Sequence, residues 1–163
     1  MEVWAAMTLS LALLLAFFIG FLAGLRSLTP AATTAWATHL GWLKLPRPLF
    51  FIGTTSAVVV FTLLALTELV ADKLPQTPSR TAPPGLIARA VMGALTGACV
   101  ASAGGQGGVL GALLGVAGAM AGTFGGYQAR TRLVKSLGTP DFVIAALEDL
   151  LSIGGSLWLV SRF

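Results

Sequence analysis

Charged side chains stand inside or next to long apolar stretches of this sequence, and they are its main candidates for chemistry. Glu68 and Asp72 are four residues apart, so they share one face of a helix. Glu148 lies about six residues inside the last apolar stretch. A charge in hydrocarbon costs ~2.5–3.5 kcal/mol on insertion scales, so such groups normally point into a helix bundle and pair. The available partners are Arg26, Arg89 and Arg130.

These charges allow two interpretations. They can be structural pairs that lock a bundle together, or Glu68 and Glu148 can form a centre that binds a proton or a cation. The candidate ion- or solute-binding residues are Arg26, Glu68, Asp72, Arg80, Arg89, Gln128, Arg130 and Glu148. A single cysteine, Cys99, and a single histidine, His39, provide neither a nucleophile–base pair nor a typical zinc site. We therefore expect no catalytic residue, no metal and no cofactor.

Prolines and hydroxyl residues gather between positions 72 and 85. Four prolines and Gly85 exclude a helix there, and Thr77, Ser79 and Thr81 surround Arg80. Hydroxyl and guanidinium donors of this kind can hold a phosphate, a lipid headgroup or a carboxylate. The segment can equally be a stiff, inert connector, with the next helix beginning at Gly85.

The composition places these residues in a membrane protein. Of 163 residues, 56% are hydrophobic and only 10% are charged, against roughly 25% charged in soluble domains. A soluble globular protein is therefore excluded. The net charge of +4 is carried by few residues, which we interpret as membrane-surface anchors and not as a nucleic-acid interface.

Uncharged stretches predict an all-α, polytopic transmembrane bundle that forms one integral membrane domain over residues 1–163. Residues 3–25, 48–67 and 142–160 are each long enough to span a bilayer, the last despite Glu148 and Asp149. Residues 90–129 form two spans, because the glycines at 104–108 favour a turn. Five spans result, with residues 30–43 as an interfacial or re-entrant helix. Six Lys/Arg residues against four favour an N-terminus inside.

Two segments suggest an inverted repeat. Residues 19–26 align with 121–128 through paired glycines, and each is followed by a span with a glutamate. The halves would be 7–74 and 109–161, with 86–103 as a linker span that inverts the second half. Transporters with such repeats bind substrate between the halves. Chance recurrence in a glycine-rich sequence is the alternative.

Glycines recur every three or four residues at Gly111, Gly115, Gly118, Gly122 and Gly126. They form a stripe on one helix face, which favours close helix packing over a pore lining. Because five short spans bury little surface, we also expect a homo-oligomer, most simply a dimer.

Three sequence features resemble one family. They are residues 24–30 (GLRSLTP), residues 68–85 with their proline-rich loop, and the acidic pair that begins residues 148–151. Together they resemble the bacterial membrane family called domain of unknown function 4126, over nearly the whole chain. The resemblance implies a bacterial inner-membrane location and no particular activity.

Two functions follow as hypotheses. The first is a transporter or channel-like protein for a small polar or ionic solute, with the intramembrane carboxylates as its ion site. The second is a non-catalytic assembly module that packs through its glycine faces. The expected partners are the lipid bilayer, the solute and a second copy of the chain, and no nucleic acid. An enzyme is disfavoured.

Overall fold

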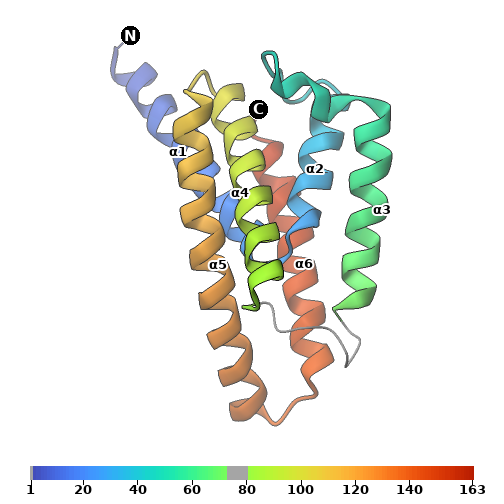
Figure 1. The fold of residues 1–163 in the computed structure, drawn as a ribbon. Coiled ribbons are helices and arrows are strands. Elements are labelled where there is room, and N and C mark those ends of the chain that lie inside the picture. Colours follow the sequence, from blue (N-terminus) through green and yellow to red (C-terminus); the bar gives the residue numbers. More distant parts are fainter. Residues whose placement is uncertain (1, 73–80) are drawn as a thin grey trace.

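The computed structural model describes the backbone of residues 2–72 and 81–163 and the side chains of residues 10–72 and 81–163. Every regular element in these ranges is helical, which confirms the predicted all-α class (Figure 1). In chain order the elements are α1 (Glu2–Leu25), α2 (Leu28–His39), the 3-10 helix η1 (Leu49–Gly53), α3 (Thr55–Ala71), α4 (Pro83–Ala103), α5 (Gly108–Leu137) and α6 (Asp141–Val160).

Five of these helices lie on the predicted apolar spans, and the break between α4 and α5 falls at the predicted glycine turn. Several boundaries differ. The span predicted over residues 48–67 is divided into η1 and α3, and α5 continues to Leu137. α4 begins at Pro83 and not at Gly85, because proline is tolerated in the first helical turn, where backbone N–H groups have no partner within the helix.

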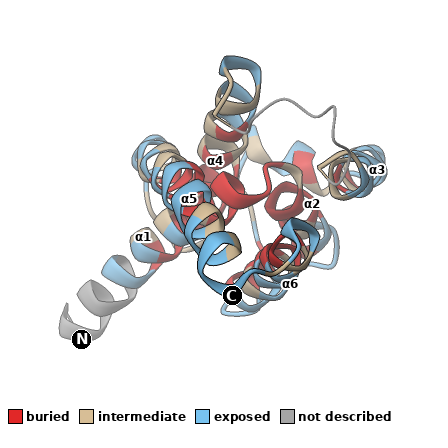
Figure 2. Cartoon of the chain, turned by 90° about the horizontal axis from the view of Figure 1, so that it is seen from below, coloured by how far each residue is buried: buried red, intermediate tan, exposed pale blue. Residues whose placement is uncertain are grey.

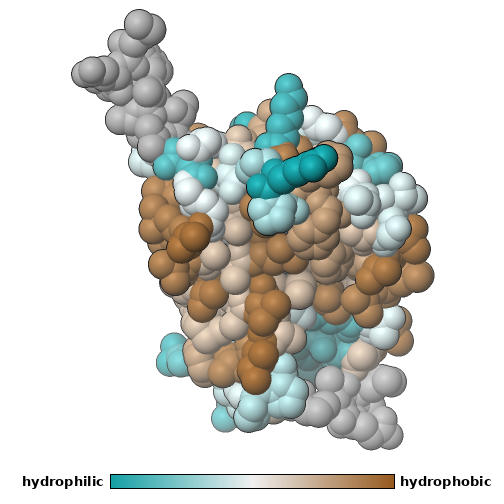
Figure 3. Space-filling view, turned by 45° about the horizontal axis from the view of Figure 1, so that its top comes forward, coloured by the Kyte–Doolittle hydropathy of each residue, from teal (hydrophilic) through white to brown (hydrophobic). Residues whose placement is uncertain are grey.

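Three of the helices, α4, α5 and α6, are long and apolar enough to cross a membrane. Residues 10–25 of α1 and 55–71 of α3 are shorter apolar helices. Large apolar side chains are exposed along the sides of the bundle, while polar residues gather toward its ends (Figure 3). A surface of this kind needs lipid around it, so the chain is a membrane protein.

Successive helices run in opposite directions, and the two termini lie at the same end of the bundle (Figure 1). Arg26, directly after α1, forms an ion pair with Asp72, directly after α3, so both helices end at one place. We call this the Arg26 end and the opposite one the Trp42 end. In the predicted path the two helices are consecutive spans and end on opposite sides. The structure differs because α2 carries the chain back before α3 begins.

α2 lies inside the bundle, whereas the sequence predicts an interfacial or re-entrant helix there. Eight of its twelve residues are buried, and it packs on α3, α4, α6 and η1 (Figure 2). Its buried residues are almost all alanine and threonine, whose small side chains let neighbouring helices approach closely. A helix lying along the bilayer surface would expose one face, so the burial disfavours that alternative.

The contacts do not support the inverted repeat. A Cβ added to Gly20 would overlap Gly115, and one added to Gly24 would overlap Ala119, so α1 and α5 run side by side in the same direction. α3 and α6 run in opposite directions (Figure 1). A two-fold axis in the membrane plane would reverse both pairs, so it cannot relate segments 7–74 and 109–161.

The glycine stripe of α5 packs against main chain on two sides. A Cβ at Gly115 would overlap the carbonyl oxygen of Gly93 in α4, and a Cβ at Gly118 or Gly122 would overlap carbonyl oxygens of α1. The predicted close packing is therefore internal to the chain, and it joins α1, α4 and α5 into one unit.

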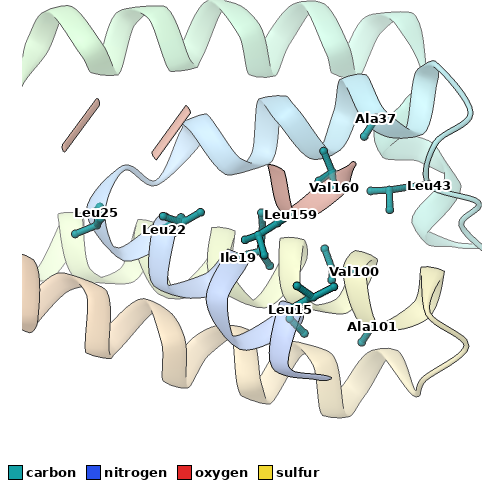
Figure 4. Packing of buried hydrophobic residues seen from close by; sticks show 11 residues of the cluster. Leu15, Ile19, Leu22, Leu25, Ala37, Leu43, Val100, Ala101, Leu159 and Val160 are labelled. Carbon is teal, nitrogen blue, oxygen red and sulfur yellow. The ribbon is translucent and has the colours of Figure 1, made fainter. Parts of the chain in front are cut away.

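An apolar cluster fills the space between this unit and helices α2 and α6. Leu15, Ile19 and Leu22 of α1 meet Val100 of α4 and Leu159 of α6 (Figure 4). Toward the Trp42 end, Ala37, Leu43 and Val160 close the same layer.

The first prediction compares two glycines of α5. Gly115→Ala forces a methyl group into the backbone of α4, and overpacking of this kind costs ~1–3 kcal/mol or more. Gly125→Ala meets no atom within 4 Å and should be neutral or stabilise the helix by ~0.5–1 kcal/mol. Thermal unfolding in detergent measures both. Equal midpoints for the two variants would contradict this packing.

Candidate functional site

Five of the six acidic residues in the sequence lie toward the Arg26 end, and each has a partner that would stabilise its charge. Together with Arg26 and Arg130 we call them the charged cluster. Its carboxylates are Glu68, Asp72, Asp141, Glu148 and Asp149, contributed by α3, α6 and the residues that flank them.

Arg26 is the centre of the cluster. Its side chain is fully buried, although it lies in the short turn between α1 and α2. One guanidinium nitrogen pairs with Asp72 at the end of α3, and Nε lies 2.6 Å from Oδ1 of Asp149 in α6. Two carboxylates from different helices thus converge on one buried cation.

Glu68 is bound by backbone N–H groups and a hydroxyl, and not by one of the arginines that the sequence offers as partners. Its Oε1 accepts hydrogen bonds from the backbone N–H (2.8 Å) and the hydroxyl (2.5 Å) of Ser27, and its Oε2 accepts one from the N–H of Leu28 (2.9 Å). These N–H groups belong to the start of α2, where Ser27 makes no capping bond of its own. Glu68 therefore caps α2 from a neighbouring helix, and its charge also matches the positive end of the helix dipole.

Arg130 of α5 holds the other two carboxylates. Its Nε and Nη2 donate to the two oxygens of Asp141 at 2.7 and 2.5 Å, a bidentate pair, and Nη1 lies 3.3 Å from Oε2 of Glu148. Asp141 begins α6, so the pair also fixes the turn between α5 and α6. Glu148 is buried.

The predicted site residues are thus divided. Glu68 and Glu148, which the sequence places in one centre, have separate partners, and Gln128 is exposed on α5. Arg89 is buried in α4, where its Nη1 donates to the carbonyl oxygen of Gly85 at 3.2 Å. Arg80 lies outside the described residues.

Sequence reasoning missed two members of the set, Asp149 and Asp141. Asp149 was visible as a neighbour of Glu148, but helix periodicity alone does not say which of two adjacent carboxylates faces Arg26. Two buried hydroxyls were also missed. Neither Thr29 Oγ1 nor Ser152 Oγ has a hydrogen-bond partner among the described residues.

The Trp42 end carries a cavity of about 640 Å³. It opens where α2, α4 and α6 end, and its lining residues are Gly41, Trp42, Lys44, Ala103, Ser161 and Phe163. Next to it, the guanidinium of Arg162 lies 4.2 Å from the ring centre of Trp158, a cation–π contact. The bundle is thus ion-paired at one end and hollowed at the other.

Within the described residues, no group of three or more His, Cys, Asp or Glu side chains has the geometry for a metal ion. Cys99 is buried in α4, and the His39 ring is engaged with the carbonyl oxygen of Gly53 at the Trp42 end.

Comparison with known proteins identifies one family. The family described as "Domain of unknown function (DUF4126)" matches residues 13–161, which confirms the resemblance seen in the sequence. No curated protein and no solved structure matches the chain.

The second prediction tests the cap on α2. Glu68→Gln removes the charge and leaves one accepting oxygen for three donors, so we expect a loss of ~0.5–2 kcal/mol in stability and faster hydrogen exchange at the Ser27 and Leu28 amides. The control is Thr67→Ala, because that exposed hydroxyl bonds only within α3. Unchanged exchange at both amides would contradict the capping role.

The third prediction concerns Arg26. Arg26→Met leaves Asp72 and Asp149 without their cation, and breaking a buried pair in this way costs ~3–5 kcal/mol. The triple variant with Asp72→Asn and Asp149→Asn removes the uncompensated charges and should recover most of that loss. Thermal unfolding in detergent measures both variants. If the triple variant has the same unfolding midpoint as the single one, the loss of stability does not come from these two carboxylates.

Proposed function

Since the chain belongs to the DUF4126 family, whose description states no activity, we propose its function from its own geometry: it is an integral membrane transporter or channel-like protein for a small polar or ionic solute. The charged cluster is the gate at one end of its pathway. The observation that carries this proposal is the complete burial of Arg26 between Asp72 and Asp149.

Burial of such a group needs a reason beyond stability. Replacing a buried ion pair with apolar side chains is often neutral or stabilising, so a buried pair is weak support for a purely structural role. Ionisable residues inside membrane proteins commonly mark pathways for ions or solutes. Arg26 holds one anionic partner at the end of α3 and one on α6 at the same time, and release of either can move the two helices relative to each other.

The difference between the two ends supports the same function. Ion pairs close the Arg26 end, a cavity opens the Trp42 end, and apolar residues such as Leu43 and Val160 separate the two. A transporter that exposes its site to one side at a time needs an occluded arrangement of this kind.

The proposed location is a bacterial inner membrane, which the chain crosses several times. By their positions along the helices, five described basic residues lie toward the Arg26 end and three toward the Trp42 end. The positive-inside rule then favours the Arg26 end in the cytoplasm and both termini outside. The five-span prediction placed the N-terminus inside. The orientation proposed here is the opposite one, because α2 runs back through the bundle between α1 and α3 and so changes which loops share a side with the N-terminus.

The assembly module has less support. The glycine faces on which that hypothesis depends are covered by α1 and α4 of the same chain. A homodimer would have to use another surface, such as the apolar outer face of α3, and it stays a prediction.

The fourth prediction uses purified protein in liposomes, with light scattering as the readout. Three gradients are applied: potassium chloride with valinomycin, potassium gluconate with a protonophore, and urea. We expect protein-dependent flux with at least one of them. Asp149→Asn weakens the ion pair that holds Arg26 and so destabilises the closed state of the gate. Every ~1.4 kcal/mol lost from the closed state raises the population of the open state about tenfold, so the flux rate should rise severalfold.

Arg132→Gln is the control, because that residue is exposed and lies near the same end without belonging to the charged cluster. Its flux should equal that of the unchanged protein. If all three gradients give the rate of protein-free liposomes, the transport proposal is wrong.

A further inference from the structure

We infer that the transported solute is a small inorganic anion, which reaches Arg26 from the cavity at the Trp42 end. The inference rests on the proposed function and names its substrate class. Two independent features carry it: the charge around the cavity, and the chemistry of the buried atoms that lack a partner.

The cavity end is basic. Lys44 lines the cavity, Arg47 lies in the connection between α2 and η1, and Arg162 follows α6 between the lining residues Ser161 and Phe163. No acidic side chain lies at this end among the side chains that the structure describes, since all five of those belong to the charged cluster. A concave surface with one sign of charge and low-dielectric walls raises the local concentration of the opposite ion. The cavity therefore favours anions.

Three of the buried polar atoms that lack a hydrogen-bond partner are able to donate. In the part of the chain described, Arg26 Nη2, Thr29 Oγ1 and Ser152 Oγ have no hydrogen-bond partner. Thr29 follows Arg26 by one helical turn, and Ser152 follows Asp149, the Arg26 partner, by one turn of α6. α2 and α6 pack together and both run toward the cavity, so these donors lie on the cavity side of the ion pair.

Buried donors without partners are rare, because each one costs free energy. Arg26 repels a cation, whereas an anion can accept hydrogen bonds from the guanidinium and from hydroxyls such as those of Thr29 and Ser152. The carboxylates of Asp72 and Asp149 oppose an anion at the same place. A bound anion therefore weakens the hold of these carboxylates on Arg26, and loading of the site then also releases the gate.

The test uses the same liposomes. With potassium chloride and valinomycin we expect chloride flux, and with potassium gluconate or urea none above protein-free liposomes. Lys44→Glu places a negative charge in the cavity and should lower chloride flux five- to tenfold, with Lys44→Gln between the two. Lys135→Gln, an exposed lysine at the opposite end, should leave the flux unchanged.

The outcomes separate this inference from the proposed function. Flux of potassium or urea without chloride flux overturns the anion assignment and leaves transport standing. Chloride flux that is equal in Lys44→Glu and the unchanged protein overturns the route through the cavity. Rates at the protein-free level in every arm overturn both. A folded state for each variant is checked by its elution from a sizing column in detergent.

Discussion

The bundle depends on keeping one guanidinium out of both water and lipid. Arg26 carries a positive charge and is fully buried, so its burial has to be balanced by anions. The sequence provides them from α3 and α6, which fixes where these helices lie relative to the turn between α1 and α2. The same turn presents the N–H groups that Glu68 accepts. Four helices are thus positioned by two consecutive residues, Arg26 and Ser27.

The molecule divides into two parts that are held by different forces. α1, α4 and α5 are in backbone contact through glycines. Such packing depends on van der Waals contact, which is lost when the helices move apart. α2, α3 and α6 are joined to them and to each other through apolar side chains and through polar pairs, and the polar pairs can exchange partners at constant charge. Any motion that opens the bundle is therefore expected in the second part, with the first as its frame.

Local patterns were sufficient for much of this fold. The length of the uncharged stretches predicted the apolar helices, and the glycines at 104–108 predicted the turn between α4 and α5. Residues 30–43 misled because fourteen residues are too few for a full span, and helix periodicity does not say whether a helix is surrounded by neighbours. That one error reversed the direction of α1 relative to α3. The free-energy cost of placing a charge in the membrane predicted that Arg26, Glu68 and Glu148 would be paired. Which partner each of them takes depends on how the helices pack.

The interior of the second part shows where a pathway can run. Near the Trp42 end, Ala37, Leu43 and Val160 form a dry layer between α2 and the rest of the bundle. Nearer the Arg26 end, buried hydroxyls such as Ser152 replace apolar groups. A solute that left the cavity would cross a short apolar barrier and then meet donors. The barrier belongs to α2 and α6, so separating these two helices opens it, while the glycine-packed contact of α1 with α5 stays intact.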